Sequence, residues 1–375
     1  MKDLIVFAED LGGHPSSTQH LVRHLANDRK VLWVNSIGLR QPTLSFRDGK
    51  RVVNKIAGFL KQKDLPNQTQ PNHNITEVNL LTIPAPSSNL SRRVARDLMI
   101  HQLMPHIEKE GLSNPILWSS LPTAADLCGH LNEHAVVYYC GDDFSALEGV
   151  NHKTAEQHEL KLIDKADLIL AASEELEQRF PASKTCLLRH GVDFELFSTP
   201  VKRASDLPNN QHASHHIAGF YGSLSSWLDY DLIRQVATQL TNWTFIFIGP
   251  DMMQHNPLPN LPNIIYLGEK SHHELPSYSQ HWDVSMMPFK VNAQINACNP
   301  LKLMEYLATG RPVVSTHFPA LAPYMPHIYS ATNKQEFVQQ LLLAVDSKNQ
   351  DTSEIVRNQS WQNKSQFTSW LMELL

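Results

Sequence analysis

The chain has 375 residues, 42% of them apolar and 18% charged, which favours about two globular domains. Its 32 basic and 37 acidic residues give a net charge of −5, which argues against a nucleic-acid-binding protein. The four cysteines are scattered and the 20 histidines show no metal-ligand spacing, so we expect reduced thiols, a cytoplasmic location, and neither metal nor cofactor. No apolar run is long enough for a signal peptide or a membrane span.

Short apolar runs alternate with helical periodicity along the chain, which is typical of parallel sheets covered by helices. In the first half, strands are expected at Leu4–Ala8, Val31–Asn35, Thr76–Leu81, Ile116–Ser119, Ala135–Tyr139, Leu168–Ala172 and Thr185–Leu188. In the second half they are expected at Ile217–Gly222, Thr244–Ile248, Ile264–Leu267, Val284–Met287 and Pro312–Thr316. The sequence therefore predicts an α/β fold.

The segment Ser198–His216 is rich in proline, asparagine, serine and histidine, and we interpret it as a linker. It would join a Rossmann-like domain over residues 1–198 to a second one over residues 217–358. Ligands bind outside the carboxyl ends of the strands in such sheets, so the two sheets are expected to face a cleft. Residues 359–375 form a predicted amphipathic helix that would either pack at the domain junction or cap the second domain. Its apolar side would carry Trp361, Phe367, Trp370 and Leu371.

The run NPLKLMEYLATGRPVVS, residues 299–315, predicts a helix that opens with polar groups and is followed by a buried strand. Asn299 suits the N-cap and Pro300 the first helical position. The free N–H groups of the first turn attract anions, and Lys302 adds a positive charge beside them. Glu305 projects from the same side about 5 Å further along, where it would suit the two hydroxyls of a ribose. The run fits a nucleoside diphosphate, but a capped helix with an exposed Lys–Glu pair has the same spacing.

This run is similar to the donor-site segment of glycosyltransferase family 4 and related GT-B enzymes, in which two glutamates eight residues apart precede YLA-x-G-x-PVV. Other segments resemble the teichuronic-acid-biosynthesis type of this family, in the family's order. They are HPSSTQHLVRHL near the start, YYCGDDFSAL (Tyr138–Leu147), ADLILAASEEL (Ala166–Leu176), RHGVDFELF (Arg189–Phe197) and GFYGSLSSWLDYDLI (Gly219–Ile233).

The resemblance implies a GT-B fold whose C-terminal helix crosses back. It also implies a hexosyltransferase that moves a sugar from a nucleotide-diphosphate sugar to a hydroxyl of a lipid-linked glycan in bacterial surface polysaccharide synthesis, with retention of configuration. Two departures bear on the donor: Ala297 stands where the family's first glutamate would fall, and GSLSSWLDYD (222–231) lacks the family's basic pair for the diphosphate. Lys302 would therefore carry more of the phosphate charge and act catalytically on the leaving group.

Further donor-binding candidates follow predicted strands. Gly222 and Ser223 end the first strand of the second half, and Gly249 ends the next. A glycine there lets the backbone approach a phosphate, although a tight turn needs one as well. Arg189 or His190 would face the diphosphate across the cleft.

Candidates for acceptor chemistry lie in the first half. Asp142 and Asp143 follow the strand AVVYYC, and either could take the proton of the acceptor hydroxyl; Asp142 is preferred because it lies nearer the strand end. One of them would otherwise cap the next helix. Gly13, His14 and His20 are candidate acceptor-binding residues, or surface residues without a role.

Arg47–Lys63, RDGKRVVNKIAGFLKQK, holds six basic residues and one aspartate, interleaved with apolar ones. A second basic stretch contains Arg92, Arg93 and Arg96. Basic amphipathic helices dock on anionic membranes, with roughly 1 kcal/mol for each basic residue. This interpretation places the protein on the inner face of the cell membrane; a solvated helix face is the alternative.

Two other classes are compatible with the sequence. A sugar-nucleotide epimerase of the same fold would use the ribose carboxylate without a membrane-binding face. A non-catalytic scaffold would explain Ala297 and the missing basic pair. A dehydrogenase is disfavoured because no G-x-G-x-x-G follows the first strand of either half.

Overall fold

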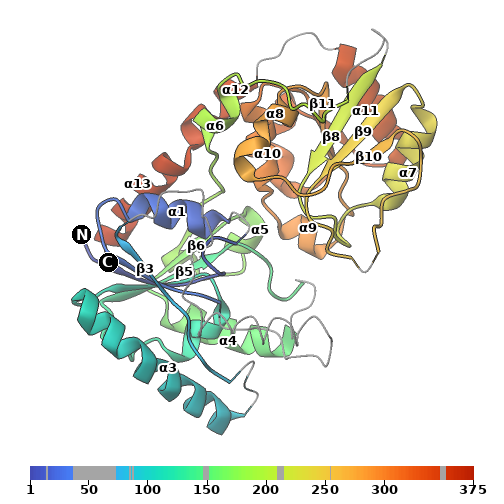
Figure 1. The fold of residues 1–375 in the computed structure, drawn as a ribbon. Coiled ribbons are helices and arrows are strands. Elements are labelled where there is room, and N and C mark those ends of the chain that lie inside the picture. Colours follow the sequence, from blue (N-terminus) through green and yellow to red (C-terminus); the bar gives the residue numbers. More distant parts are fainter. Residues whose placement is uncertain are drawn as a thin grey trace. The chain divides into compact units, whose positions relative to one another are not determined.

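The structure is a computed structural model that describes residues 1–13, 16–36, 73–83, 86, 88–146, 152–208, 215–253, 255–346 and 352–375. These residues form two compact units (Figure 1): Met1–Leu188 with Ser365–Leu375, and Arg189–Lys364. Each unit contains one parallel sheet, as the sequence predicts.

The sheet of the first unit has seven parallel strands in the order β3-β2-β1-β4-β5-β6-β7. They are β1 (Leu4–Phe7), β2 (Val31–Val34), β3 (Ile75–Val78), β4 (Ile116–Ser119), β5 (Ala135–Cys140), β6 (Leu168–Ala171) and β7 (Thr185–Leu187). The central strands are buried at every residue because helices cover both faces, and they therefore read as unbroken apolar runs. The strand order reverses at β1, between β2 and β4, which is where open α/β sheets bind ligands.

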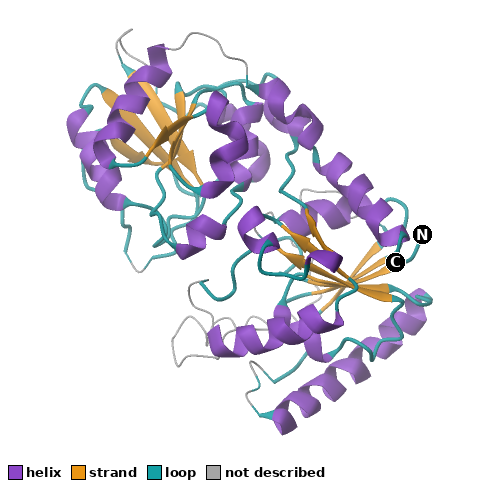
Figure 2. Cartoon of the chain, turned by 180° about the vertical axis from the view of Figure 1, so that it is seen from behind, coloured by secondary structure: helices purple, strands orange, loops and turns teal. Residues whose placement is uncertain are grey.

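Helices cover both faces of this sheet (Figures 1 and 2): α1 (Ser17–Leu25) lies on one face, and α3 (Asn89–Glu110) and α4 (His152–Lys165) lie on the other. The shorter elements are α5 (Glu174–Glu177) and the 3-10 turns η1 (Pro122–Asp126) and η2 (Ala182–Lys184). The last helix, α13 (Trp361–Glu373), contributes its second half to this unit. There the hydroxyl of Ser365 donates to the carbonyl of Leu21, on α1, at 3.1 Å.

The sheet of the second unit has six parallel strands in the order β10-β9-β8-β11-β12-β13. They are β8 (His216–Tyr221), β9 (Trp243–Ile248), β10 (Ile264–Tyr266), β11 (Val284–Met287), β12 (Val313–Thr316) and β13 (Tyr329–Ala331). Helices α7 (Tyr230–Gln239) and α11 (Lys334–Asp346) pack together on one face, and α10 (Leu301–Ala308) lies on the other (Figure 1). The remaining elements are α6 (Phe194–Ser198), η3 (His272–Glu274), α8 (Pro276–Ser279), α9 (Ala293–Ala297), η4 (Pro319–His327), α12 (Ser353–Val356) and η5 (Arg357–Gln359).

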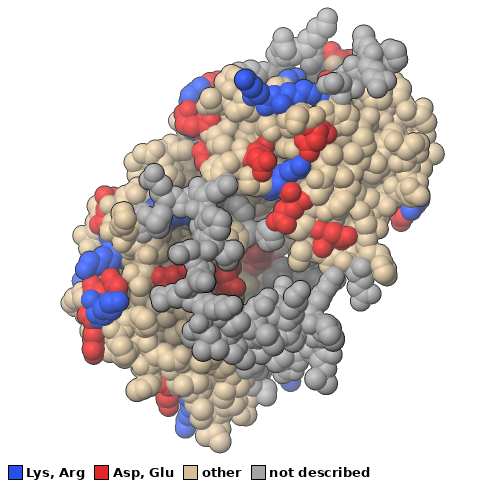
Figure 3. Space-filling view, viewed as in Figure 1, with Lys and Arg blue, Asp and Glu red and all other residues tan. Residues whose placement is uncertain are grey.

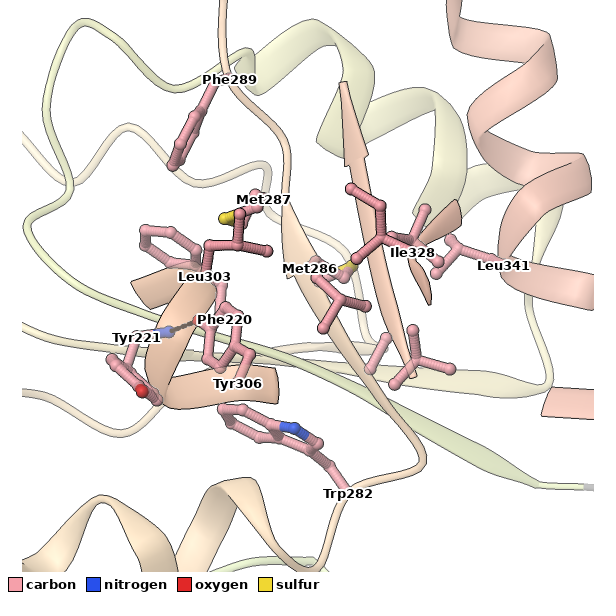
Figure 4. Packing of buried hydrophobic residues seen from close by; sticks show 14 of the residues in the cluster. Phe220, Tyr221, Trp282, Met286, Met287, Phe289, Leu303, Tyr306, Ile328 and Leu341 are labelled. Atoms are coloured by element: carbon pink, nitrogen blue, oxygen red, sulfur yellow. Dashed lines mark hydrogen bonds between the residues drawn. The ribbon is translucent and has the colours of Figure 1, made fainter. Parts of the chain in front are cut away.

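The core of the second unit is aromatic where β8 meets α10 (Figure 4). Trp282 packs directly on Gly219 of β8, where an added Cβ would lie 1.8 Å from the ring, so this position requires glycine. The backbone N–H of Tyr221 donates to the hydroxyl of Tyr306 at 3.0 Å, the dashed line in Figure 4. This bond fixes α10 against the carboxyl end of β8.

All strands expected from the sequence are present, with ends that differ by at most three residues. The sequence does not predict β13, because its three residues contain no apolar run. The units divide after Leu188 rather than at residue 198.

The segment interpreted as a linker is described up to residue 208, and this part of it is packed against the second unit. The N–H of Ala204 donates to the carbonyl of Ser277 at 3.0 Å, Arg203 donates to the carbonyl of His281 at 3.0 Å, and Leu207 is buried. This part of the segment is therefore packed structure of the second unit. Backbone hydrogen bonds, a few apolar contacts and polar side-chain contacts, among them the 2.7 Å ion pair between Asp206 and Lys270, hold it, and none of these appears as apolar periodicity.

The C-terminal helix is amphipathic, and its buried side agrees only in part with the expectation: Trp361 is buried as expected, but the next two aromatic residues are not. Phe367 and Trp370 are 40% and 54% exposed and stack on each other with ring centroids 5.8 Å apart. The buried positions instead follow the helical repeat and are Trp361, Ser365, Thr368 and Met372. The expectation went wrong because two of these four residues are small and polar.

Candidate functional site

Two glycines lie at the candidate site, at the carboxyl ends of two neighbouring strands of the second unit. Gly222 and Gly249 follow β8 and β9 directly, and both have φ of +136°, a conformation open to glycine. A Cβ on Gly249 would lie 2.2 Å from the carbonyl oxygen of Gly222. A Cβ on Gly222 would lie 2.2 Å from Cε of Lys302. Gly249 is therefore required by backbone packing and Gly222 by its positive φ, and the second contact places Lys302 at the end of β8.

Lys302 places its ammonium over two aromatic rings at the candidate site. Its ammonium lies 5.3 Å from the ring centre of Trp227 and 5.8 Å from that of Phe220. It has no ion-pair partner in the part of the chain that the structure describes. Burial lowers its pKa, and the charge of Glu305 opposes this shift. A half-buried, unpaired ammonium is suited to bind an anion.

The start of α10 differs from the expectation by one residue. The helix begins at Leu301, and Pro300, at φ −76° and ψ 119°, occupies the N-cap position without a side-chain bond. The fixed φ of proline is compatible with that extended conformation, which moves Asn299 out of the cap; its side chain is buried just before the helix. The N–H groups of Leu301 and Lys302 donate to no described residue, so the helix start still presents free donors.

Glu305 lies one turn beyond Lys302 and has two protein partners. The hydroxyl of Tyr221 donates to one carboxylate oxygen at 2.8 Å, and Nε2 of His272 lies 2.7 Å from the other. Burial and the neighbouring carboxylate raise the pKa of Tyr221, which keeps it a donor. Each carboxylate oxygen keeps a further lone pair for a ligand hydroxyl.

The second unit thus brings together five of the predicted donor residues: Lys302, Glu305, Gly222, Ser223 and Gly249. Ser223 is half-buried, and its hydroxyl has no hydrogen-bond partner among the described residues. Ala297, at the family's first glutamate position, is buried at the end of α9.

Arg189 and His190 have other surroundings. Arg189 lies near Tyr324 and Lys364, whose pKa values it affects. His190 is buried beside Trp361, and burial together with the charge of Lys364 lowers its pKa to about 3. It is neutral near pH 7, so it adds no charge to an anion site.

In the first unit the two aspartates after β5 are not equivalent. Asp143 is buried and forms an ion pair of 2.6 Å with Arg179 and hydrogen bonds with Ser145. Burial raises its pKa, but the bonds from Arg179 and Ser145 outweigh burial, and the net pKa is lowered. Asp143 therefore has a structural role in this loop. The side chain of Asp142 is exposed at the surface. Desolvation by the surrounding protein atoms and the charge of Asp143 nevertheless raise its pKa.

Glu9 is a residue that the sequence analysis missed. It follows β1, where the strand order reverses, and it accepts a hydrogen bond from the hydroxyl of Ser16, the N-cap of α1. Burial raises its pKa to about 7; a backbone bond opposes the shift, and the charge of Asp142 adds to it. Glu9 and Asp142 are thus two interacting carboxyl groups at the carboxyl ends of the sheet. The strand order that joins them is not visible in the sequence.

Of the three predicted acceptor residues near the N-terminus, the structure describes Gly13 and His20. Gly13 closes a turn in which its N–H donates to the carbonyl of Asp10 at 3.1 Å, and His20 lies half-buried on α1. His14 lies outside the described residues.

Of the two predicted basic stretches, the structure bears only on the second. Arg47–Lys63 lies outside the described residues. In the second stretch, Arg92 is buried and donates two bonds of 2.8 Å to Asp126, so it does not form part of an exposed basic face. On the face shown in Figure 3, basic and acidic side chains are interspersed. No helix in the described ranges is long and apolar enough to span a membrane, and they contain no cluster of histidine, cysteine or acidic residues suited to a metal ion.

Comparisons with known proteins show what this chain is similar to. Residues 216–346 match the family model described as glycosyl transferases group 1. The second unit, with its glycine turns, Lys302 and Glu305, is therefore a glycosyltransferase group 1 domain.

The chain is 32% identical over 232 residues to TuaH of Bacillus subtilis (strain 168), which is named for glycosyl transfer in teichuronic acid biosynthesis. The match covers 57% of this chain and 58% of TuaH. The chain thus spans somewhat more than half the length of this curated relative.

Two solved structures have the same two-sheet arrangement. HepE of Anabaena, in complex with UDP and glucose, superposes with a TM-score of 0.69 over the whole of both chains at 13% identity. Sucrose-phosphate synthase from Thermosynechococcus elongatus superposes with a TM-score of 0.70 at 13% identity, over 100% of this chain and 99% of that one. At such identities these likenesses establish the fold, which is GT-B.

Proposed function

We propose that this protein transfers a sugar from a nucleotide-diphosphate sugar to a hydroxyl of a lipid-linked glycan in bacterial surface polysaccharide synthesis. The observation that carries this proposal is Lys302, a cation that has no ion-pair partner among the described residues and lies at the end of β8 with a carboxylate one turn away. The name of TuaH supports the pathway, and HepE supports a uridine nucleotide as the first donor to test.

For the donor, Lys302, the free N–H groups at the start of α10 and the hydroxyl of Ser223 bind the diphosphate. Glu305 accepts hydrogen bonds from the two ribose hydroxyls. As the bond between the anomeric carbon and the phosphate oxygen breaks, negative charge grows on the diphosphate, and Lys302 stabilises it.

For the acceptor, Asp142 and Glu9 bind the attacking hydroxyl in the first unit. A general base works best when its pKa lies near the working pH, and Glu9, at about 7, meets this condition. We propose retention of configuration, by the resemblance to family 4. In this route the departing diphosphate oxygen takes the proton of the acceptor hydroxyl, and Asp142 and Glu9 orient that hydroxyl. The anomeric configuration of the product, read by NMR, tests this point, and an inverted product would instead make Asp142 or Glu9 the general base.

We also propose contact with an anionic membrane surface through Arg47–Lys63. On the described part of the first unit, α3 supports this with three apolar residues exposed on one side, spaced four apart: Leu90, Val94 and Leu98, at 74%, 50% and 41%. Arg93 is exposed beside them. Replacing Lys55, Lys61 and Lys63 by glutamate should release the protein from anionic liposomes, and undiminished co-sedimentation would exclude this contact.

The deciding experiment is a panel of nucleotide sugars, screened by thermal stabilisation and then by transfer to a lipid-linked acceptor. We expect one donor to raise the melting temperature and to be consumed only when acceptor is present. Conversion of the donor without acceptor would instead identify an epimerase, and no stabilisation by any member would favour a non-catalytic scaffold.

A further inference from the structure

Glu305 is oriented by a residue from a different part of the chain. His272 lies in η3, between β10 and α8, and its Nε2 approaches one oxygen of Glu305 to 2.7 Å. An ionised carboxylate only accepts hydrogen bonds, so Nε2 carries the proton in this contact. Both side chains are mostly buried, at 16% and 13% exposure, which limits competition from water.

The turn that carries His272 is itself fixed. The N–H and the hydroxyl of Ser271 both donate to the carboxylate of Glu274, at 3.0 and 2.6 Å. The imidazole packs against the edge of Phe197, with ring centroids 5.4 Å apart, and the opposite partner of Glu305, Tyr221, stacks on the same phenyl ring at 6.3 Å. One buried ring thus supports both groups that bind the carboxylate.

We propose that His272 is a positioning residue for the nucleotide site: it holds Glu305 in the orientation that binds the ribose hydroxyls and so makes the protein selective for ribonucleotides. This inference rests on the proposed function. With Tyr221 bound to one oxygen and His272 to the other, rotation of the carboxylate is blocked, and the remaining lone pair of each oxygen is available to a diol.

The alternative is a structural contact that closes the turn at residues 271–274 without any effect on ligands. The two roles differ in one measurable quantity: the dissociation constant of a nucleotide that lacks its ribose hydroxyls, divided by that of the same nucleotide with them. A structural role changes the affinity for both compounds alike, whereas a positioning role changes only the affinity for the compound that has the hydroxyls.

The experiment measures binding of UDP and 2′,3′-dideoxy-UDP by calorimetry, with the GDP and ADP pairs as further probes. The variants are His272→Ala, His272→Gln, which keeps an N–H donor, and Glu305→Gln, with His273→Ala as the matched control on an exposed neighbouring histidine. We expect His272→Ala to reduce the ratio roughly fivefold or more. His272→Gln should restore most of it, and His273→Ala should leave it unchanged. If His272→Ala does not fold, His272→Phe keeps the ring contact with Phe197 and removes the donor.

The outcomes are separable. If no nucleoside diphosphate binds the unaltered protein, the proposed function fails, and this inference fails with it. If UDP binds but Glu305→Gln leaves the ratio unchanged, the ribose assignment of Glu305 is wrong. If Glu305→Gln lowers the ratio and neither His272→Ala nor His272→Phe does, the donor site stands and the role of His272 alone is overturned.

Discussion

Replacing Lys302 by methionine should change ligand binding and stability in different ways. Its ammonium lies over two aromatic rings and has no ion-pair partner among the described residues. Each such cation–π contact stabilises by about 0.5–1 kcal/mol, but holding an unpaired charge in a half-buried place costs a similar amount. Methionine keeps the length and packs well on aromatic rings. We therefore expect the melting temperature of the ligand-free variant to change by only a few degrees.

Nucleotide binding should respond far more strongly. A hydrogen bond to a charged group contributes about 1.5–3 kcal/mol, so the loss of the ammonium should weaken UDP binding roughly 10- to 150-fold. Because burial lowers the pKa of Lys302, the cation is lost at a lower pH than in free lysine. UDP affinity of the unaltered protein should therefore fall as the pH rises into the alkaline range, and Lys302→Met should remove this dependence.

The assays are calorimetric titration with UDP at several pH values and thermal unfolding without ligand. Lys334→Met, on α11 of the same unit, is the control, because Lys334 is a partly exposed lysine with a weak 4.0 Å ion pair. An unchanged UDP affinity in Lys302→Met would refute the assignment of this lysine to the diphosphate. A large loss of ligand-free stability would instead refute the view that its charge serves a ligand.

Three further substitutions test other parts of the account. Glu9→Gln removes a carboxyl whose folded-state pKa of about 7 exceeds the ordinary 4.5. Ionisation of this carboxyl lowers the stability of the unaltered protein progressively from about pH 4.5 to 7. Measured by urea unfolding, the stability of the variant relative to the unaltered protein should therefore be higher at pH 8 than at pH 5, by up to about 3 kcal/mol. Arg179→Met leaves the buried carboxylate of Asp143 without its partner and should cost about 2 kcal/mol in the same assay, whereas an unaffected midpoint would contradict the structural role of Asp143. Gly222→Ala places a Cβ 2.2 Å from a lysine side chain at positive φ and should cost about 2 kcal/mol or more, with loss of UDP binding; a neutral effect would show that the turn is more adaptable than its geometry indicates.

The sequence predicts those features that depend on neighbours along the chain. Strands buried on both faces read as apolar runs, and Lys302 and Glu305 are placed by helical spacing alone. Asn299 was misplaced by one residue because Pro300 itself occupies the extended N-cap position. The sequence also predicts that Phe367 and Trp370 of α13 are buried, and they are exposed. The buried side of this helix contains Ser365 and Thr368, which an apolar pattern does not reveal.

The parts that sequence reasoning missed depend on contacts between distant segments. Glu9 interacts with Asp142 only because β1 and β5 lie in one sheet with β4 between them. His272 reaches Glu305 across 33 positions of sequence, and no local pattern marks it among 20 histidines. Asp142 and Asp143 are adjacent in sequence, and only the position of Arg179 distinguishes the buried, paired one from the exposed one.

The last helix has a consequence for how the protein is made. Residues 365–375 complete the first unit, yet they leave the ribosome after the whole of the second. Until then, α1 lacks Ser365, whose hydroxyl donates to the carbonyl of Leu21. The first unit therefore cannot complete its folding while the second unit is being synthesised. Removing these residues, or attaching a bulky tag beside them, should therefore harm the half of the protein that is translated first.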